Sequence, residues 1–475
     1  MSRLTRAVRE SQTERLFGAV LVLFAFRLGV RPIGDNSMFT HLRTGVDAVA
    51  GLGIPRTDPY SFTAADHRWV AQSWLPEWTY GWLHGLGGYR LVVLEQALIA
   101  SLLAMLLIRL ARAGSPARTV VAAGVVIGMS APYWAPRPLL FGLVCMALLV
   151  SVVEHRRSPW LLVPLVWLWV QCHGSFPLGL AWLVALAVGQ WLDWKARPHD
   201  TVRYIGGFVA GLAVSVLNPL GARLLAFPLT VGEKRSVFAS IVEWRSPDFQ
   251  GTAGRLALVS LVVALALLVR ARVAWRDLVP VVTFVAISLV AARNLPMAAV
   301  VIAPVVGRAL RRGDGADRPT RSAFLGPPPR ARANRAVLAT IVVLFILFGA
   351  SIWDKPPLSV RLYPEKAVSF LDANGYLGPS HHVAEQDFVG NYLTLRYGRR
   401  AKVFIDDRYD MYPVQVSTDY RRLVAGRPES LGVLDHYDVD TVLWDRTLPL
   451  ATILALNGRW RQVFDDDDWV VYVRL

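Results

Sequence analysis

Long apolar runs separated by short polar segments make up most of the chain before residue 355. Most of the runs are about 15 to 20 residues long, close to the length of helix that crosses a hydrocarbon core of about 30 Å. Each run is therefore predicted to be a membrane-spanning helix. The predicted spans lie near residues 16–33, 90–110, 118–133, 138–154, 159–172, 176–192, 204–218, 255–270, 277–292, 295–309 and 335–353.

One pair of runs leaves the number of spans open. The runs at 159–172 and 176–192 are broken only by Gln-Cys-His-Gly-Ser, so they form either two spans or one interrupted, re-entrant element. We therefore expect about ten or eleven spans within residues 16–353.

The pattern changes from about Pro357 onward, where short β-branched or aromatic runs alternate with helical stretches. Strands are predicted at 382–384, 402–405, 441–444 and 469–473, and helices at 365–374 and 417–425. This order is typical of a small α/β domain with a partly parallel sheet. The predicted fold class is thus an all-α polytopic membrane helical bundle followed by a small C-terminal α/β domain at 357–475.

Composition supports the membrane prediction and narrows the partners. Of the 475 residues, 54% are hydrophobic and 18% are charged, against the roughly 25% charged residues usual in soluble domains. The net charge of +16 comes from Arg residues in short stretches between apolar runs rather than on one basic face, so no nucleic-acid partner is expected. Cys145 and Cys172 lie within or at the edge of apolar runs, which argues against a disulfide framework and a metal site.

The positive charges instead predict the orientation of the chain. With residues 1–15 in the cytoplasm, the inside segments hold about 23 Lys and Arg residues in roughly 75 positions, against about 11 in roughly 110 outer positions. The Arg- and Pro-rich segment 311–335 becomes a cytoplasmic linker. The loop 34–89 and the C-terminal domain then lie outside. The first span is expected to stay uncleaved, because no small-residue cleavage pattern follows it.

The candidate chemistry begins in the outer loop 34–89, which is rich in Asp, His and Trp. Asp35 directly follows the first span, where a carboxylate at the lipid–water boundary is partly desolvated yet within reach of an outside substrate. A helix starting near Ser37 would bring His41 and Gly45 onto one face. The competing interpretation of Asp35 is a helix cap or a topological marker.

Asp58 and Trp74 of the same loop have two interpretations each. Asp58 precedes Pro59, which is a standard turn pattern, and the alternative is a contact with substrate. Trp74 belongs to a series of aromatic residues at mostly helical spacing beside the second span. The series favours an aromatic belt on an interfacial helix, with a platform for a sugar ring or lipid chain as the alternative.

Polar side chains from several spans are predicted to share the outer surface. They include Arg137 in Ala-Pro-Arg-Pro, His173 in the helix break and Arg293 before Asn294. Taken singly, each is a boundary residue that satisfies its own solvation. Their common side raises the hypothesis that Arg137 and Arg293 clamp an anionic phosphate.

Two acidic stretches of the C-terminal domain are further candidates. Residues 402–410 place three carboxylates and an Arg after a predicted strand, where ligands often bind in α/β sheets, although ordinary solvated turns share this composition. The run Asp465–Asp468 is predicted to be a hairpin turn, because the ligand spacing of a calcium loop is absent.

Several segments together carry a resemblance that spans most of the chain. They are Asp35 with Thr40–Leu42 and Gly45, Gly53–Thr63, Trp69–Val70, Gln72, Trp74–Glu77, His173–Phe176, Asn218–Gly221, Ala292–Pro296 and Phe404–Tyr412. In these segments the chain looks like a largely uncharacterised bacterial family of polytopic membrane proteins. That family resembles the GT-C glycosyltransferases, relatives of protein mannosyltransferases and lipid A aminoarabinose transferases.

The resemblance implies a GT-C-like bundle in the bacterial plasma membrane. It implies a polyprenyl-phosphate sugar as donor at the outer face, and a glycan, lipid or protein of the cell envelope as acceptor. Asp35 would be the general base for the acceptor hydroxyl, and His41 would hold the donor phosphate or assist. Arg137 and Arg293 would stabilise the leaving phosphate.

The remaining candidates for substrate contacts are Asp58, Trp74 and His173. Family members often carry two acids in a D-x-D arrangement, whereas this chain has Asp35-Asn36-Ser37. One carboxylate is a poor site for a divalent cation, so no metal cofactor is expected. This departure leaves a metal-independent transferase or an inactive relative.

Three classes of function therefore stay under consideration, and the sequence does not decide whether the chain is an enzyme. The leading hypothesis is sugar transfer at the outer face. The second is a non-catalytic membrane protein of envelope assembly or binding, whose terminal domain recruits a partner. A transporter is third, because the sequence shows neither mid-membrane charges nor internal repeats.

Overall fold

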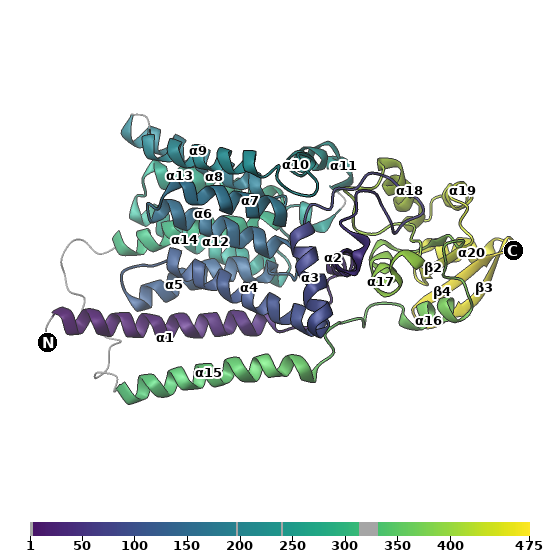
Figure 1. The fold of residues 1–475 in the computed structure, drawn as a ribbon, viewed down its shortest axis with the longest axis horizontal. Helices are drawn as coiled ribbons and strands as arrows, with labels where there is room; N and C mark the ends of the chain where they lie inside the picture. The colour runs from purple at the N-terminus through teal and green to yellow at the C-terminus, as the bar shows by residue number, and fades with distance from the viewer. Residues whose placement is uncertain (1–2, 196–197, 239–240, 313–330) are drawn as a thin grey trace. The chain divides into compact units, whose positions relative to one another are not determined.

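A computed structural model describes residues 3–195, 198–238, 241–312 and 331–475. The chain divides into two compact units, each built from separate stretches (Figure 1). The first unit comprises Met1–Pro32, Arg90–Leu217 and Val242–Pro357, and the second comprises Ile33–Tyr89, Asn218–Ile241 and Leu358–Leu475. Most of the predicted linker 311–335 lies outside the described residues.

The first unit is a bundle of helices, and each of the predicted apolar runs forms one of them. The helices are α1 (Arg3–Gly29), α4 (Tyr89–Leu110), α5 (Pro116–Ser130), α6 (Leu139–Glu154), α7 (Leu162–Cys172), α8 (Phe176–Trp194), α9 (His199–Val214), α12 (Thr252–Ala271), α13 (Trp275–Val290), α14 (Leu295–Arg312) and α15 (Ala331–Asp354). The ambiguous pair forms two helices, α7 and α8, with His173, Gly174 and Ser175 between them.

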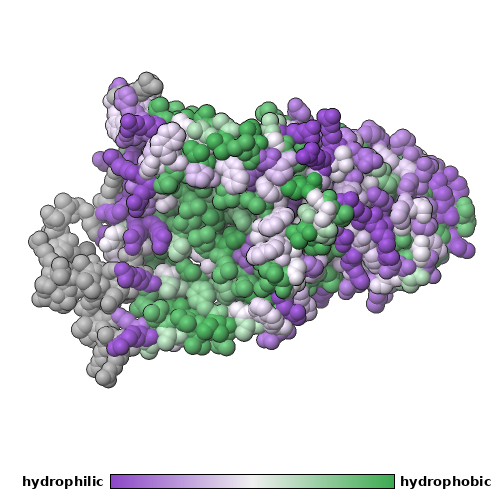
Figure 2. Space-filling model, viewed as in Figure 1, coloured by the Kyte–Doolittle hydropathy of each residue, from purple (hydrophilic) through white to green (hydrophobic). Residues whose placement is uncertain are grey.

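The chain is an all-α polytopic membrane protein with a small C-terminal α/β domain. Among the described residues, five helices are long and apolar enough to cross a membrane, in α4, α8, α12, α14 and α15. Only 28% of the apolar window of α12 and 11% of that of α15 is buried, so most of their side chains suit contact with lipid. Figure 2 shows the hydrophobic residues gathered over the helices of this unit.

Small residues let the helices of the first unit approach closely, as is usual in membranes. A Cβ on Gly29 of α1 would lie 2.4 Å from the Cα of Ala97 on α4. A Cβ on Gly189 of α8 would lie 2.4 Å from the carbonyl oxygen of Trp275, the first residue of α13. The Asp193 carboxylate of α8 also accepts the Trp275 and Arg276 N–H groups at 3.0 and 2.9 Å, which caps α13.

A buried ion network joins three helices of this unit at one end. Arg308 of α14 donates to the Asp277 carboxylate of α13 through Nη2 at 2.6 Å and Nε at 3.2 Å. It also donates to Glu154, the last residue of α6. Bidentate pairing satisfies Asp277, which is 3% exposed. The end of α6, the first turn of α13 and the C-terminal part of α14 thus meet in one place. All three border segments predicted to be cytoplasmic, while the side itself stays a prediction.

The second unit is a mixed α/β structure. Its helices are α2 (Asn36–Asp47), α3 (Trp74–Gly87), α10 (Arg223–Glu233), α11 (Arg235–Phe238), α16 (Glu365–Ala373), α17 (Asp387–Tyr397), α18 (Val414–Val424), α19 (Ser430–His436) and α20 (Pro449–Leu456). Its strands are β1 (Val383–Ala384), β2 (Thr441–Asp445), β3 (Trp460–Asp465) and β4 (Trp469–Arg474). The sheet has the order β1-β2-β4-β3, with β1 parallel to β2 and the other pairs antiparallel. The partly parallel sheet is therefore confirmed.

One predicted strand is wrong, and one strand was missed. Residues 402–405 form only isolated bridges at Val403, to Ser61 and Val383. The reason is a partner elsewhere in the chain, since the N–H groups of Phe404 and Ile405 donate to the Glu385 side chain at 3.0 and 3.2 Å instead of to a strand. The missed strand is β3, whose two exposed residues after Trp460 hide the alternating pattern.

Two glycines bring α2 and α3 into backbone contact. A Cβ on Gly45 of α2 would lie 1.8 Å from the carbonyl oxygen of Glu77 on α3. A Cβ on Gly81 of α3 would lie 2.0 Å from the carbonyl oxygen of Gly45. No side chain fits at either position unless the helices separate.

We expect Gly45→Ala and Gly81→Ala each to lower the free energy of unfolding by about 3 kcal/mol or more, because the new methyl group overlaps backbone atoms. The matched control is Gly85→Ala on α3, where no described atom lies within 4 Å of the new Cβ. It should raise stability by about 0.5–1 kcal/mol. Thermal unfolding of the purified full-length protein in detergent measures all three. Equal melting temperatures for Gly45→Ala and Gly85→Ala would contradict the contact.

Candidate functional site

Asp35 begins α2 as its cap. The residue has an extended backbone, with φ −77° and ψ 119°, and its Oδ1 accepts the N–H of Ser37 at 3.1 Å. Its side chain is half-buried. The cap interpretation of Asp35 is thus observed, and it fixes the carboxylate at the start of the helix that also carries His41.

His41 pairs with a buried carboxylate of α3. Its Nδ1 lies 2.7 Å from Oε1 of Glu77, with 22% of the His41 side chain and 4% of the Glu77 side chain exposed. The backbone contact at Gly45 and Gly81 holds the two helices at this separation. Within the described residues, Oε2 of Glu77 is buried without a hydrogen-bond partner.

The pair with Glu77 also decides what chemistry the His41 ring can do. When Nδ1 donates to Glu77, the tautomer is fixed and Nε2 carries the lone pair. Nε2 then accepts a proton as a base or, once protonated, donates to a phosphate oxygen. Glu77 has no predicted role, although it lies in the segment Trp74–Glu77, one of those that carry the resemblance. An acidic residue in the first turn of a helix is ordinarily explained by its favourable interaction with the helix dipole. Only the contact with His41 shows that Glu77 belongs to the candidate site.

Asp58 forms the predicted turn and is also part of a buried ion cluster. Its Oδ1 and Oδ2 accept the N–H groups of Tyr60 and Ser61, each at 3.0 Å. Arg408 donates to Asp58 from Nη1 at 2.7 Å and to Asp406 from Nη2 at 2.7 Å. Both carboxylates and the guanidinium are buried. This arrangement uses Asp58 to hold the loop to residues 406–408 rather than to present it to solvent.

Aromatic rings complete the surroundings of Arg408. Its guanidinium carbon lies 4.6 Å from the ring centre of Trp69 and 5.1 Å from that of Tyr60. Such cation–π contacts are strongest where water is excluded. The cluster therefore joins three parts of the second unit: the turn at Asp58, the segment around Trp69 and the residues after Val403.

The charge of Asp35 also acts on a buried tyrosine. Burial is the main cause that raises the pKa of Tyr363, and the charges of Asp35, Asp407 and Asp387 raise it further. The Asp387 carboxylate accepts the hydroxyls of Tyr409 at 2.9 Å and Tyr420 at 3.0 Å. Tyr363 therefore stays a neutral phenol near Asp35.

Asp410 lies beside a lysine in the same unit. Burial raises the pKa of Asp410 to about 6, although the positive charge of Lys234 acts to lower it. The Lys234 ammonium donates to the carbonyl oxygens of Asp410 and Tyr412 at 2.6 and 2.8 Å. Burial in turn lowers the pKa of Lys234.

Trp74 is the first residue of α3 and is half-buried. Further along the same helix, the rings of Trp78 and Trp82 stack with centres 6.5 Å apart and planes 3° apart. These two side chains are 43% and 47% exposed. An exposed aromatic stripe fits both an interfacial belt and a ligand platform, so the role of Trp74 stays a prediction.

The first unit holds Arg137, His173 and Arg293. Arg137 pairs with Glu243 at 2.7 Å, and Arg293 lies over the ring of Trp244 at 4.3 Å. The charges of Glu243 and Arg137 both act on Arg293, so the structure brings the two arginines of the predicted phosphate clamp into one neighbourhood. His173 is buried, and its Nδ1 accepts the N–H of Ser175 at 3.2 Å within the break between α7 and α8.

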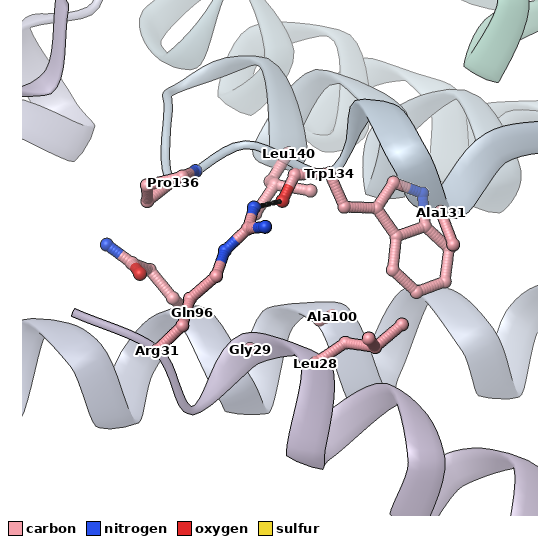
Figure 3. A pocket seen from close by; sticks show the side chains of 9 residues that line it. All are labelled: Leu28, Gly29, Arg31, Gln96, Ala100, Ala131, Trp134, Pro136 and Leu140. Atoms are coloured by element: carbon pink, nitrogen blue, oxygen red, sulfur yellow. Dashed lines mark hydrogen bonds between the residues drawn. The ribbon is translucent and has the colours of Figure 1, made fainter. Parts of the chain in front are cut away.

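A small cavity also lies in the first unit, between the end of α1, the α4 residues Gln96 and Ala100, and the segment from Ala131 to Leu140 (Figure 3). Arg31 reaches into it and donates from Nη2 to the carbonyl oxygen of Trp134 at 2.6 Å. Gln96 lines it, and its Nε2 has no hydrogen-bond partner in the described part of the chain. The volume of about 30 Å³ suits one or two water molecules and not a sugar.

The candidate residues thus fall into two sets. Asp35, His41, Asp58 and Trp74 belong to the second unit, whereas Arg137, His173 and Arg293 belong to the first. In residues 3–195, 198–238, 241–312 and 331–475, no group of three or more His, Cys, Asp and Glu side chains is arranged to hold a metal ion.

Comparison with known proteins shows a structural likeness. No family model matches the sequence, and no curated protein matches it. A solved structure of the archaeal oligosaccharyltransferase AglB from Archaeoglobus fulgidus, in complex with an inhibitory peptide and a dolichol-phosphate, is similar at 12% identity and a TM-score of 0.47. The similarity covers 90% of this chain and 69% of that one. A likeness at this level concerns the course of the chain and carries nothing about its chemistry.

We expect Arg408→Met to lower the free energy of unfolding by about 3–5 kcal/mol, because it leaves two buried carboxylates without their cation. The control is Arg459→Met, which removes a pair with Asp435 whose side chains are 58% and 40% exposed. Its effect should stay below about 1 kcal/mol. Chemical unfolding of the full-length protein in detergent compares the two. Similar losses of unfolding free energy in both variants would show that the buried cluster contributes no more than the exposed pair.

The raised pKa of Asp410 predicts a pH dependence. Its ordinary value is 3.8 and its folded value is about 6, so the folded state binds more protons between these values and stability falls as pH rises through them. Above about pH 6 the folded protein carries a buried charge that costs at most about 3 kcal/mol. Asp410→Asn should therefore match the wild-type melting temperature near pH 4 and exceed it at pH 8. A constant difference across this range would contradict the shift.

Proposed function

We propose that the protein is a membrane glycosyltransferase that transfers a sugar from a polyprenyl-phosphate donor to an acceptor of the cell envelope at the outer face. The observation that carries the proposal is the pair between His41 of α2 and Glu77 of α3. Asp35 is the cap at the start of α2. The apolar helices supply a bilayer setting for a polyprenyl chain. The resemblance of the loop 34–89 supplies the reaction class.

In the proposed reaction the acceptor hydroxyl loses its proton to Asp35 while its oxygen bonds to the anomeric carbon of the sugar. The bond between that carbon and the phosphate oxygen breaks, and polyprenyl phosphate leaves with the electron pair. His41 holds the phosphate through Nε2, with Glu77 setting its orientation. Asp35 is the cap of α2 and His41 lies within that helix, so one element positions both proposed groups.

For Arg137 and Arg293, the role of stabilising the charge on the leaving phosphate is proposed from the resemblance alone. Arg137 and Arg293 share the neighbourhood of Glu243, which keeps two cations close together without a large local excess of charge. The proposed reaction uses no metal, because Asp35-Asn36-Ser37 offers a single carboxylate where members of the resembled family often have two.

The test is turnover by the purified full-length protein in proteoliposomes that contain a panel of polyprenyl-phosphate hexoses and pentoses, with envelope extract as acceptor. Release of polyprenyl phosphate is measured. We expect Asp35→Asn to lower kcat by about 10²–10⁴-fold. His41→Gln and Glu77→Gln should mainly raise KM for the donor, by about tenfold or more, because they weaken phosphate binding.

The matched control is His67→Gln, which removes an exposed imidazole from the same loop. It should leave kcat and KM unchanged. Wild-type turnover in Asp35→Asn would reject Asp35 as the base. Unchanged donor KM in both His41→Gln and Glu77→Gln would reject the phosphate role of the pair.

A further inference from the structure

The second unit contains a groove of about 840 Å³ that no part of the proposed mechanism uses. Its walls come from the segment 361–366 that leads into α16, the first turn of α17, the end of β2 and the β3–β4 turn. The volume lies in the usual range of about 300–1,000 Å³ for ligand sites. The groove is therefore large enough for a substrate, unlike the cavity beside Arg31.

The groove begins at Asp35. Gly34 and Asn36, the two neighbours of Asp35, line it, and so does Tyr363, on which the charge of Asp35 acts. A ligand in the groove therefore passes beside the residue proposed to take the acceptor proton. This position fits an acceptor better than it fits the lipid part of the donor.

Aromatic rings form one wall. The ring centre of Phe388 lies 5.8 Å from that of Tyr363 and 6.0 Å from that of Trp469, with interplanar angles of 55° and 60°. Phe388 is half-buried and is the most exposed of the three, whereas Tyr363 and Trp469 are 8% and 9% exposed and support it from behind. Flat apolar faces of this kind pack against the C–H faces of sugar rings.

The polar lining accepts more hydrogen bonds than it donates. It holds five carboxylates, from Glu365, Asp445 and the run Asp466–Asp468, against two basic side chains, Arg361 and Lys366. In the described structure no hydrogen bond or ion pair engages the carboxylates of Asp467 and Asp468. Ionised carboxylates only accept hydrogen bonds, so they select a ligand rich in donors and disfavour an anionic one.

We infer that this groove binds the acceptor, and that the acceptor is an uncharged, hydroxyl-rich saccharide. The inference rests on the proposed function and makes its acceptor more specific. Sugar hydroxyls donate to the carboxylates of Asp467 and Asp468, and the sugar faces pack on Phe388 and its neighbours. The saccharide end that reaches Gly34 and Asn36 presents its hydroxyl to Asp35.

Binding of the full-length protein in detergent to an array of neutral, amine-bearing and acidic oligosaccharides tests the inference. We expect retention by neutral oligosaccharides. The variant Asp467→Asn with Asp468→Asn should lower affinity about tenfold, because a neutral amide accepts weaker hydrogen bonds. Phe388→Ala, checked for an unchanged melting temperature, should lower it by a similar factor. The control is Glu429→Gln with Asp438→Asn, which removes two exposed charges of the same unit outside the groove.

Each other outcome overturns the inference. Retention only by amine-bearing or only by acidic oligosaccharides would assign the groove to another ligand. Equal losses of affinity in the control would show that saccharides bind outside the groove. Retention by no saccharide at all would remove the site. Turnover separates this failure from that of the proposed function, because release of polyprenyl phosphate with a normal dependence on Asp35 can persist in a protein that binds no saccharide in the groove. Conversely, saccharide binding without any turnover would reject the transferase and leave the groove as a binding site.

Discussion

The second unit is built around one buried guanidinium. Arg408 lies between the carboxylates of Asp58 and Asp406, and the three groups are buried together. An unpaired charge at this depth is strongly unfavourable, so the contact between the loop 34–89 and residues 406–408 is costly to break. The hydrogen bond from Thr40 of α2 to Asn391 of α17 adds a second connection, and together they position Asp35 and His41.

The sequence predicted the helices of the first unit well, because each is encoded by a continuous apolar run whose meaning is local. It also predicted the turn at Asp58 and three of the strands. It did not predict that the loop 34–89 would pack in one unit with residues after 358, because that association depends on Arg408 and Asp58, which are 350 positions apart. Side-chain pairing over such a separation leaves no periodic signal.

The candidate site shows the same limit. Asp35 and His41 stand out because their residue types are chemical and their position after an apolar run is recognisable. Glu77 does not stand out, since its role comes only from its distance to His41. The error at 402–405 has a similar origin, because the Glu385 side chain takes the N–H groups that a strand would use. Local sequence reports the tendency of a segment, and its partner decides the outcome.

The contact between Gly45 and Gly81 has a mechanical consequence. The helices α2 and α3 meet through peptide groups rather than through adjustable side chains. Sliding one helix along the other would bring side chains into overlap with backbone atoms, so we expect the two helices to move as one rigid element. Asp35 lies at the start of α2, and the exposed rings of Trp78 and Trp82 belong to α3. A displacement of these rings is therefore expected to shift the carboxylate as well, whereas helices that meet through flexible side chains could move separately.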